Sequence, residues 1–430
     1  SINENMLHCY KEIQYFTSVG VPSQMRHTAV NIYTPNSGAP EKVRLQKGKI
    51  MKYTLILVLA AVMILPAIAE ETPDSWRVYI GTYTGGESEG VYMLQLDTKS
   101  GQLENLELAG AVENPSFIAL HPEKPLLFSV GQGLDADGNR KGMASALSIN
   151  PADGKLTLIS QENTVGSGPC HVFVDRTGRH ILAANYGSGS VAVLPINDDG
   201  SLDAATDFEQ HEGSSVNPRR QEGPHAHCVK LDPAGEFAFV IDLGLDKIMV
   251  YKYDDATGTL ESNDPPFAAV APGAGPRHFA FHPNGNFAYV VNELDNTVTA
   301  FTYDADQGRL ETLQTIGTLP QGFDKENTTA EICVHPSGKF LYASNRGHDS
   351  IACFAVDTNT GQLTASGQVS TGGNVPRNFN VSPCGRFLIA ANQKSNNVVA
   401  FRINQKTGLP EATGSEVEVA MPVCVVFGRP

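Results

Sequence analysis

A turn sequence that recurs about every fifty residues constrains this chain more than any other feature. The clearest copy spans residues 276–301, where an apolar segment, the turn His282-Pro-Asn-Gly285 and a second apolar run follow one another. Proline and glycine suit a tight reversal at this point, and the β-branched and aromatic residues that flank it favour strands. The turn recurs at intervals of 47 to 57 residues, at Pro122, Arg176, Pro233, Pro283, Pro336 and Pro383.

A repeat of four antiparallel strands with this period is typical of a β-propeller blade. Six repeats carry the turn, and residues 422–427 resemble the first strand of a seventh repeat with nothing after it. Residues 77–82 and 90–96 resemble the missing second and third strands. The sequence therefore predicts an all-β, seven-bladed propeller over residues 75–429, closed by pairing of the C-terminal strand with the N-terminal strands. Six or eight blades are the lesser alternatives.

The first seventy residues do not follow the repeat. Residues 1–50 are polar and lack periodicity, and we expect them to be an upstream extension that is either not native or disordered. Met51-Lys52 then precedes an apolar run that ends in Ala67-Ile-Ala69, a pattern typical of a signal peptide over residues 51–69. An uncleaved anchor is the alternative. The expected mature protein begins near Glu70 and is periplasmic or secreted; without use of the signal it is cytoplasmic.

Charge and cysteine content limit the classes of partner. The formal net charge is −15, which argues against nucleic-acid binding through a basic face. The seven cysteines include no Cys-x-x-Cys pair and no metal spacing. The carboxylates are spread out and the arginines would repel a cation, so neither a metal nor another cofactor is expected. A disulfide among Cys170, Cys228 and Cys424 stays open, although a role in the core is favoured. The expected partner is a small anionic molecule, and no stable membrane insertion is expected after signal cleavage.

Ionisable residues gather at two positions of the repeat. In a propeller blade the start of the innermost strand and the end of the second strand lie on the same face. Structural ion pairs between blades are the alternative reading of these residues. The long loop 207–223 adds Arg219 and Arg220 and is either a lid or a solvated loop. The predicted substrate-binding residues are His171, Arg220, Asp242, His278, Glu331, His348, Arg377 and Gln393.

Short motifs on this face carry a family resemblance that covers residues 77–427. They are residues 217–227 (Asn-Pro-Arg-Arg-Gln-Glu-Gly-Pro-His-Ala-His), 275–278 (Gly-Pro-Arg-His), 292–294 (Asn-Glu-Leu), 330–332 (Ala-Glu-Ile), 344–351 (Ser-Asn-Arg-Gly-His-Asp-Ser-Ile), 376–377 (Pro-Arg) and 391–393 (Ala-Asn-Gln). With these motifs the chain resembles the lactonase family of seven-bladed propellers, which includes propeller-type 6-phosphogluconolactonases and 3-carboxy-cis,cis-muconate lactonizing enzymes. The resemblance implies a catalytic cluster of His225 or His227, Arg277, Glu293 and Arg346.

The resemblance also implies a reaction. The expected activity is metal-independent hydrolysis of 6-phosphogluconolactone, a carbohydrate substrate of the pentose phosphate pathway. One histidine, helped by Glu293, would activate water, and Arg277 and Arg346 would hold the anion or stabilise the oxyanion. A cycloisomerase acting on carboxymuconate-like diacids is the first alternative. A secreted propeller that only binds a partner is the second.

Overall fold

The computed structural model describes residues 73–134 and 140–428, which form 28 strands in seven four-stranded sheets. The predicted extension and signal segment, residues 1–50 and 51–69, lie outside the described residues. None of the described residues belongs to a helix that could cross a membrane. Each sheet is one blade, and its strands pair antiparallel in the order of the chain, with one exception at the chain ends.

The strands are given blade by blade, starting with the blade that follows the first three strands. The first three blades are β4 (Phe117–Leu120), β5 (Leu126–Leu134), β6 (Arg140–Ile149) and β7 (Leu156–Asn163); β8 (Pro169–Val174), β9 (His180–Asn185), β10 (Ser190–Pro195) and β11 (Asp207–Gln210); and β12 (Ala226–Leu231), β13 (Phe237–Asp242), β14 (Lys247–Asp254) and β15 (Thr259–Ala269). The next three are β16 (Pro276–Phe281), β17 (Phe287–Asn292), β18 (Thr297–Asp304) and β19 (Arg309–Gly317); β20 (Thr328–Val334), β21 (Phe340–Arg346), β22 (Ser350–Val356) and β23 (Leu363–Ser370); and β24 (Pro376–Val381), β25 (Phe387–Asn392), β26 (Asn397–Ile403) and β27 (Pro410–Glu418). The seventh blade combines β28 (Pro422–Phe427) with β1 (Ser75–Thr82), β2 (Gly90–Asp97) and β3 (Leu103–Ala111).

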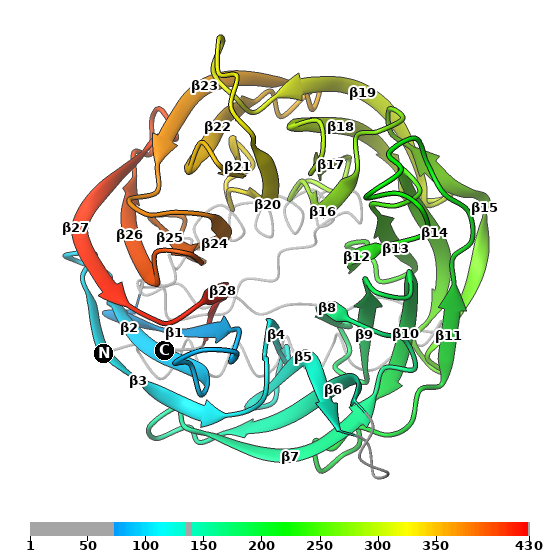
Figure 1. Ribbon diagram of the computed structural model, residues 1–430, viewed down its shortest axis with the longest axis horizontal. Helices are drawn as coiled ribbons and strands as arrows, with labels where there is room; N and C mark the ends of the chain where they lie inside the picture. The colour runs from blue at the N-terminus through cyan, green and yellow to red at the C-terminus, as the bar shows by residue number, and fades with distance from the viewer. Residues whose placement is uncertain (1–72, 135–139, 429–430) are drawn as a thin grey trace, which may run out of the picture. The chain divides into compact units, whose positions relative to one another are not determined.

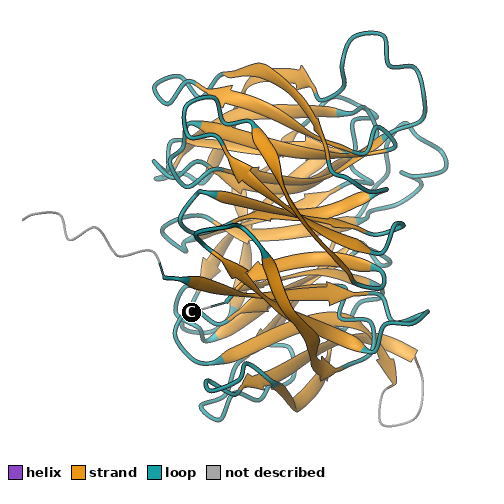
Figure 2. Ribbon diagram, turned by 90° about the vertical axis from the view of Figure 1, so that its left-hand side faces the viewer, coloured by secondary structure: helices purple, strands orange, loops and turns teal. Residues whose placement is uncertain are grey.

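The innermost strands of the seven blades surround the centre of the ring (Figure 1): β4, β8, β12, β16, β20, β24 and β28. From the side, the strands run between two faces that carry the connecting loops (Figure 2). The predicted seven-bladed, all-β fold is therefore confirmed.

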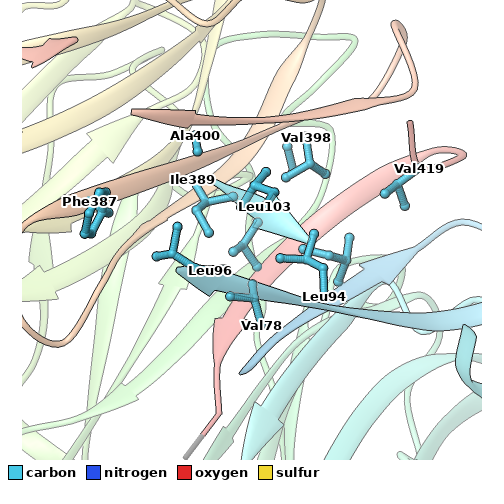
Figure 3. Close-up of a cluster of buried hydrophobic side chains, with 12 residues drawn as sticks. Val78, Leu94, Leu96, Leu103, Phe387, Ile389, Val398, Ala400 and Val419 are labelled. Atoms are coloured by element: carbon cyan, nitrogen blue, oxygen red, sulfur yellow. The ribbon is translucent and has the colours of Figure 1, made fainter. Parts of the chain in front are cut away.

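The last blade combines both ends of the described chain. β28 pairs antiparallel with β1, placing Phe427 opposite Val78 and Val425 opposite Ile80. Buried side chains from this blade pack against its neighbour, among them Val78, Leu94 and Leu96 against Phe387 and Ile389 (Figure 3). The predicted closure of the ring by the C-terminal strand is confirmed.

A β-bulge recurs where the inner strand begins. In β16, Pro276 pairs with Asn292 and His278 with Val291, which leaves Arg277 without a residue opposite it. A bulge inserts one extra residue and re-aims its side chain, and bulges are common beside active sites. The other inner strands that carry it have extra residues at Cys170, His227, Ala330 with Glu331, Arg377 and Val423.

On the opposite face, histidines before the turns join neighbouring blades. The imidazole Nε2 atoms of His121, His282 and His335 lie 3.0, 2.9 and 2.7 Å from the carbonyl oxygens of Gly178, Gly338 and Gly385, each in the turn of the following blade. A Cβ at Gly178 would lie only 2.2 Å from His121 Nε2, so the ring leaves no room for another residue. These histidines connect blades and are far from the chemistry discussed below.

Candidate functional site

A cavity of about 630 Å³ opens on the face where the inner strands begin and the second strands end. Its walls come from all seven blades and from the loop before β12. The lining residues are Tyr83, Asn114, Ser116, Gly131, Gln132, Gly168, Pro169, Cys170, Tyr186, Arg220, His227, Glu293, Thr328, Arg346 and Arg377.

The carboxylate of Glu293 organises the cationic wall of this cavity. Its Oε2 lies 2.9 Å from Arg277 Nε and 2.8 Å from Arg346 Nη2, and its Oε1 accepts a hydrogen bond of 2.6 Å from Arg220 Nη2. β20 also accepts hydrogen bonds from two of these arginines: Arg277 Nη1 donates to the carbonyl of Ala330 at 2.6 Å, and Arg346 Nη2 to that of Thr329 at 2.8 Å. One carboxylate thus fixes three arginines from three parts of the chain.

The arginines keep Glu293 ionised. Burial alone would raise the pKa of its carboxyl, but the charges of Arg346, Arg277 and Arg220 outweigh it and lower the pKa to about 2. Burial, with the charges of Arg377 and Arg346, lowers the pKa of Arg277 to about 10, so its guanidinium stays protonated at neutral pH. With both oxygens engaged and a low pKa, Glu293 is poorly suited to accept a proton.

A fourth arginine has no such partner. Arg377 is the bulged residue of β24, and its guanidinium carbon lies 5.6 Å from the ring centroid of Tyr83. Within residues 73–134 and 140–428 it forms no ion pair with a carboxylate. The guanidinium groups of Arg220, Arg346 and Arg377 line the cavity, and that of Arg277 is buried beside Glu293. Together with this one carboxylate they carry a formal charge of +3, in a chain whose formal net charge is −15. The cavity is therefore built to hold an anion.

The two predicted histidines of the 217–227 motif have different surroundings. His227, the bulged residue of β12, lines the cavity and has its Nδ1 3.6 Å from Cys170 Sγ. Burial and the nearby Arg277 charge hold its pKa well below the usual value, so the ring is neutral and can accept a proton. His225 stacks on Tyr186, with ring centroids 4.5 Å apart, and its Nδ1 lies 2.9 Å from the Tyr186 carbonyl oxygen. His225 does not line the cavity.

The floor of the cavity is a layer of buried rings and amides. His278 Nδ1 lies 2.9 Å from Glu331 Oε1, and the Asn378 amide donates to the other oxygen of Glu331. The His278 ring also contacts those of His227 and His171, with centroids 5.2 and 5.4 Å away. Burial raises the pKa of Glu331 to about 7 and lowers that of His278. The predicted residues His171, His278 and Glu331 therefore lie in or below the floor rather than in the cavity wall.

Three further predicted residues lie away from the cavity. Asp242 is fully buried and accepts hydrogen bonds from the backbone N–H groups of His225 and Gly244, at 2.7 and 3.0 Å, which fixes the turn after β13. His348 packs against Phe323 and has its Nδ1 2.7 Å from Ser350 Oγ. Gln393 follows β25 but does not line the cavity. Their predicted role in substrate binding stays a prediction.

Sequence reasoning missed several cavity residues. Tyr83 and Tyr186 follow the ends of second strands, and Tyr186 stands at the repeat position that carries Glu293 and Arg346 in other blades. That shared position was the available signal for Tyr186. Cys170 occupies the same bulge position as His227 and Arg277, but a thiol in a strand reads as a core residue. The six cysteines of the described residues are free thiols.

No group of three or more His, Cys, Asp or Glu side chains that could hold a metal ion occurs in the part of the chain that the structure describes.

Comparison with known proteins matches this arrangement to a family. The family described as "Lactonase, 7-bladed beta-propeller" matches residues 77–427. The chain belongs to this lactonase family. A 6-phosphogluconolactonase of Bacillus subtilis is 40% identical over 301 residues, covering 70% of this chain and 83% of the relative. A 6-phosphogluconolactonase of Formosa agariphila is 33% identical over 308 residues, covering 71% and 86%.

A solved structure of another lactonase agrees closely with this one. The periplasmic gluconolactonase of Pseudomonas aeruginosa superimposes with a TM-score of 0.77 at 36% identity, covering 82% of this chain and 99% of that one. The predicted family resemblance is confirmed.

Proposed function

We propose that this lactonase hydrolyses 6-phospho-D-glucono-1,5-lactone to 6-phosphogluconate. The observation that carries the proposal is the anion-binding wall of Arg220, Arg346 and Arg377, with the buried Arg277 next to it, beside a neutral imidazole, His227. A phosphorylated lactone supplies both an anionic group for the free guanidinium and an ester carbonyl for attack by water. The names of the relatives from Bacillus subtilis and Formosa agariphila support the same substrate.

The residues of the cavity suit a water-attack mechanism. His227 accepts a proton as water oxygen bonds to the lactone carbonyl carbon. Arg346 and Arg277 stabilise the oxyanion that develops. When the bond from the carbonyl carbon to the ring oxygen breaks, the imidazolium of His227 returns the proton to that oxygen. Glu293 contributes by holding the guanidinium groups in place rather than as a base, because its two oxygens are occupied by arginines.

The phosphate is best matched by Arg377. This guanidinium has no carboxylate partner in the described chain and stacks against Tyr83, which keeps its donors available to an anion. Residues 51–69 support a further part of the proposal, that the protein is exported, in keeping with the periplasmic gluconolactonase it resembles. A phosphorylated lactone would then have to be met outside the cytoplasm, so the unphosphorylated lactone is a necessary comparison.

The test is a panel of lactones, assayed with and without the phosphate and corrected for spontaneous opening. We expect turnover of both 1,5-lactones, with the higher kcat/KM for the phosphorylated one, and no loss of activity with chelator. Replacing Arg277 with Met should lower kcat about 100-fold, as loss of an oxyanion donor does, while the protein stays folded by circular dichroism.

Other outcomes separate the alternatives. Turnover of carboxymuconate but of no lactone would favour the cycloisomerase, and no turnover of any substrate would favour a binding propeller. Unchanged turnover in the Arg277→Met protein would remove this arginine from the mechanism.

A further inference from the structure

A second chamber, of about 440 Å³, lies on the other side of the floor. Its walls come from all seven inner strands, and it shares no lining residue with the lactone cavity. Phe117 of β4 and Asn378 of β24 border both the floor and this chamber. The proposed hydrolysis uses nothing in this chamber, so its composition needs a separate explanation.

Apolar and polar groups contribute about equally to the chamber wall. Phe117, Phe173 and Phe281 supply aromatic surface, and the polar lining residues are His171, Lys230, Glu331, Asn378 and Asn380. The aromatic surface suits the flat or cyclic hydrocarbon part of a small molecule, because apolar area is removed from water on binding. A specific ligand would also need a small number of polar groups that fix its orientation.

One cation in this wall has no ion-pair partner among the described residues. Lys230, from β12, places its ammonium group 5.2 Å from the ring centroid of Phe173. Among residues 73–134 and 140–428, no carboxylate lies within ion-pair distance of it. A half-buried ammonium without a counter-ion is favourable only if water or an anion compensates it.

A second donor is buried close by. His171 Nδ1 accepts a hydrogen bond of 3.4 Å from the backbone N–H of Val229, so the proton of the neutral ring lies on Nε2. That Nε2 is buried and has no hydrogen-bond partner in the described structure. The chamber thus offers one donor to a ligand, the Lys230 ammonium, while the unused imidazole N–H of His171 is buried behind its wall.

The acidic residue of the chamber, Glu331, does not neutralise the charge of Lys230. Glu331 already bonds His278 and Asn378, and its pKa near 7 leaves it partly protonated at neutral pH. Burial raises its pKa more than the Ile332 N–H, which donates to its Oε1 at 3.0 Å, and the charges of Arg277 and Lys230 lower it.

We propose that the chamber binds a small carboxylate with an aromatic or alicyclic body. The carboxylate pairs with Lys230, and the body packs between the phenylalanines. This site is independent of the lactone cavity and does not depend on the proposed hydrolysis.

The test is isothermal titration of the full-length protein with benzoate, the simplest molecule of this class. We expect saturable binding with a Kd of about 1 mM or tighter. Lys230→Met should weaken binding about tenfold or more, as loss of a charge-assisted contact does. The matched control is Lys247→Met, which also removes a lysine over a phenylalanine, Phe267 at 4.2 Å, but away from the chamber. That variant should bind as the parent does.

A further variant separates the two cavities, because benzoate is also an anion that the arginine wall attracts. Arg377→Met should leave benzoate binding unchanged. Loss of binding in Arg377→Met with retention in Lys230→Met would place benzoate in the lactone cavity and overturn the proposal. The absence of saturable binding, in a parent protein with a normal melting transition, would overturn it as well.

Discussion

At the scale of single residues, the site depends on an imbalance of charge. Three arginines share Glu293, and a fourth, Arg377, has no carboxylate partner in the described chain. Removing one partner of a buried ion pair strongly lowers the stability of the folded protein, because the other charge is left without compensation. Glu293 and its arginines are therefore expected to stay paired. Arg377 is different, because its free guanidinium gains a partner only when an anion enters. The phosphate contact therefore belongs to Arg377 more than to the three arginines of the cluster.

Arg377→Met tests this assignment. We expect KM for the phosphorylated lactone to rise about 10- to 100-fold with a smaller change in kcat, because one charged contact contributes about 1.5–3 kcal/mol. The unphosphorylated 1,5-lactone is the internal control, and its KM should rise much less. An equal rise in KM for both substrates would show that Arg377 does not bind the phosphate.

The imidazole of His227 predicts the acid limb of the pH profile. Burial and Arg277 hold its pKa well below 6.5, and a base works only when deprotonated. The kcat/KM should therefore persist below pH 6.5 and fall only at more acidic pH. Steady-state rates from pH 4 upward, corrected for spontaneous hydrolysis, measure this. A midpoint near pH 6.5 would contradict a buried, neutral His227, and His227→Gln should lose the activity at every pH.

At the scale of elements, the bulge at the start of the inner strand decides which side chains meet. The same extra position holds Cys170, His227, Arg277 and Arg377 in different blades. Four residues far apart in the chain thus arrive at one rim with their side chains re-aimed by the same local device. In β20 the bulge holds two residues, Ala330 and Glu331, and Glu331 extends into the floor.

The bulge residue Glu331 predicts a pH dependence of stability. Its folded pKa of about 7 lies above the ordinary 4.5, so the folded state holds a proton that the unfolded state releases. This contribution to stability is full below about pH 4.5 and is lost as pH rises through 7. Glu331→Gln should therefore gain stability relative to the parent between pH 5 and pH 8, by up to about 3 kcal/mol.

Melting temperatures of both proteins at pH 5 and pH 8 measure the effect of Glu331. Glu311→Gln, on the exposed side of β19, is the matched control and should show the same difference from the parent at both values. A pH-independent difference for Glu331→Gln as well would mean that Glu331 titrates like an ordinary carboxyl.

At the scale of the whole molecule, ring closure makes the seven blades one cooperative unit. β28 supplies the inner strand of a blade whose other strands lie at the opposite end of the propeller sequence, and Cys424 and Val425 each join a core cluster. Without β28, the edge of β1 and both clusters would be exposed to water. We therefore expect the closing strand to be required for folding.

Removing residues 422–430 should abolish cooperative thermal unfolding and make the protein aggregate, as followed by circular dichroism and light scattering. Removing only residues 429–430 should change little. Because Phe427 lies opposite Val78, the deleted strand can instead be placed before Ser75 through a short Gly-Ser linker, and this permuted chain should regain a cooperative transition. A cooperative transition in the chain that lacks β28 would contradict closure as the source of cooperativity.

The sequence by itself determined the repeat, and with it the blade number and the closure of the ring. The reason is local: each turn carries the proline and glycine that a tight reversal needs, and the alternating apolar runs between turns leave few other folds open. The sequence also placed Arg277, Glu293 and Arg346 on one rim, because strand starts and strand ends alternate between the two faces of a blade.

Only the tertiary structure decided which role each site residue has. Periodicity assigns a residue to a face but not to a depth, so His171, His278 and Glu331 were grouped with the rim although they lie in or below the floor. The three contacts of Glu293, the free guanidinium of Arg377 and the difference between His225 and His227 arise from packing between blades. Such contacts join residues from different repeats. The alternation of side chains within one blade therefore does not predict them.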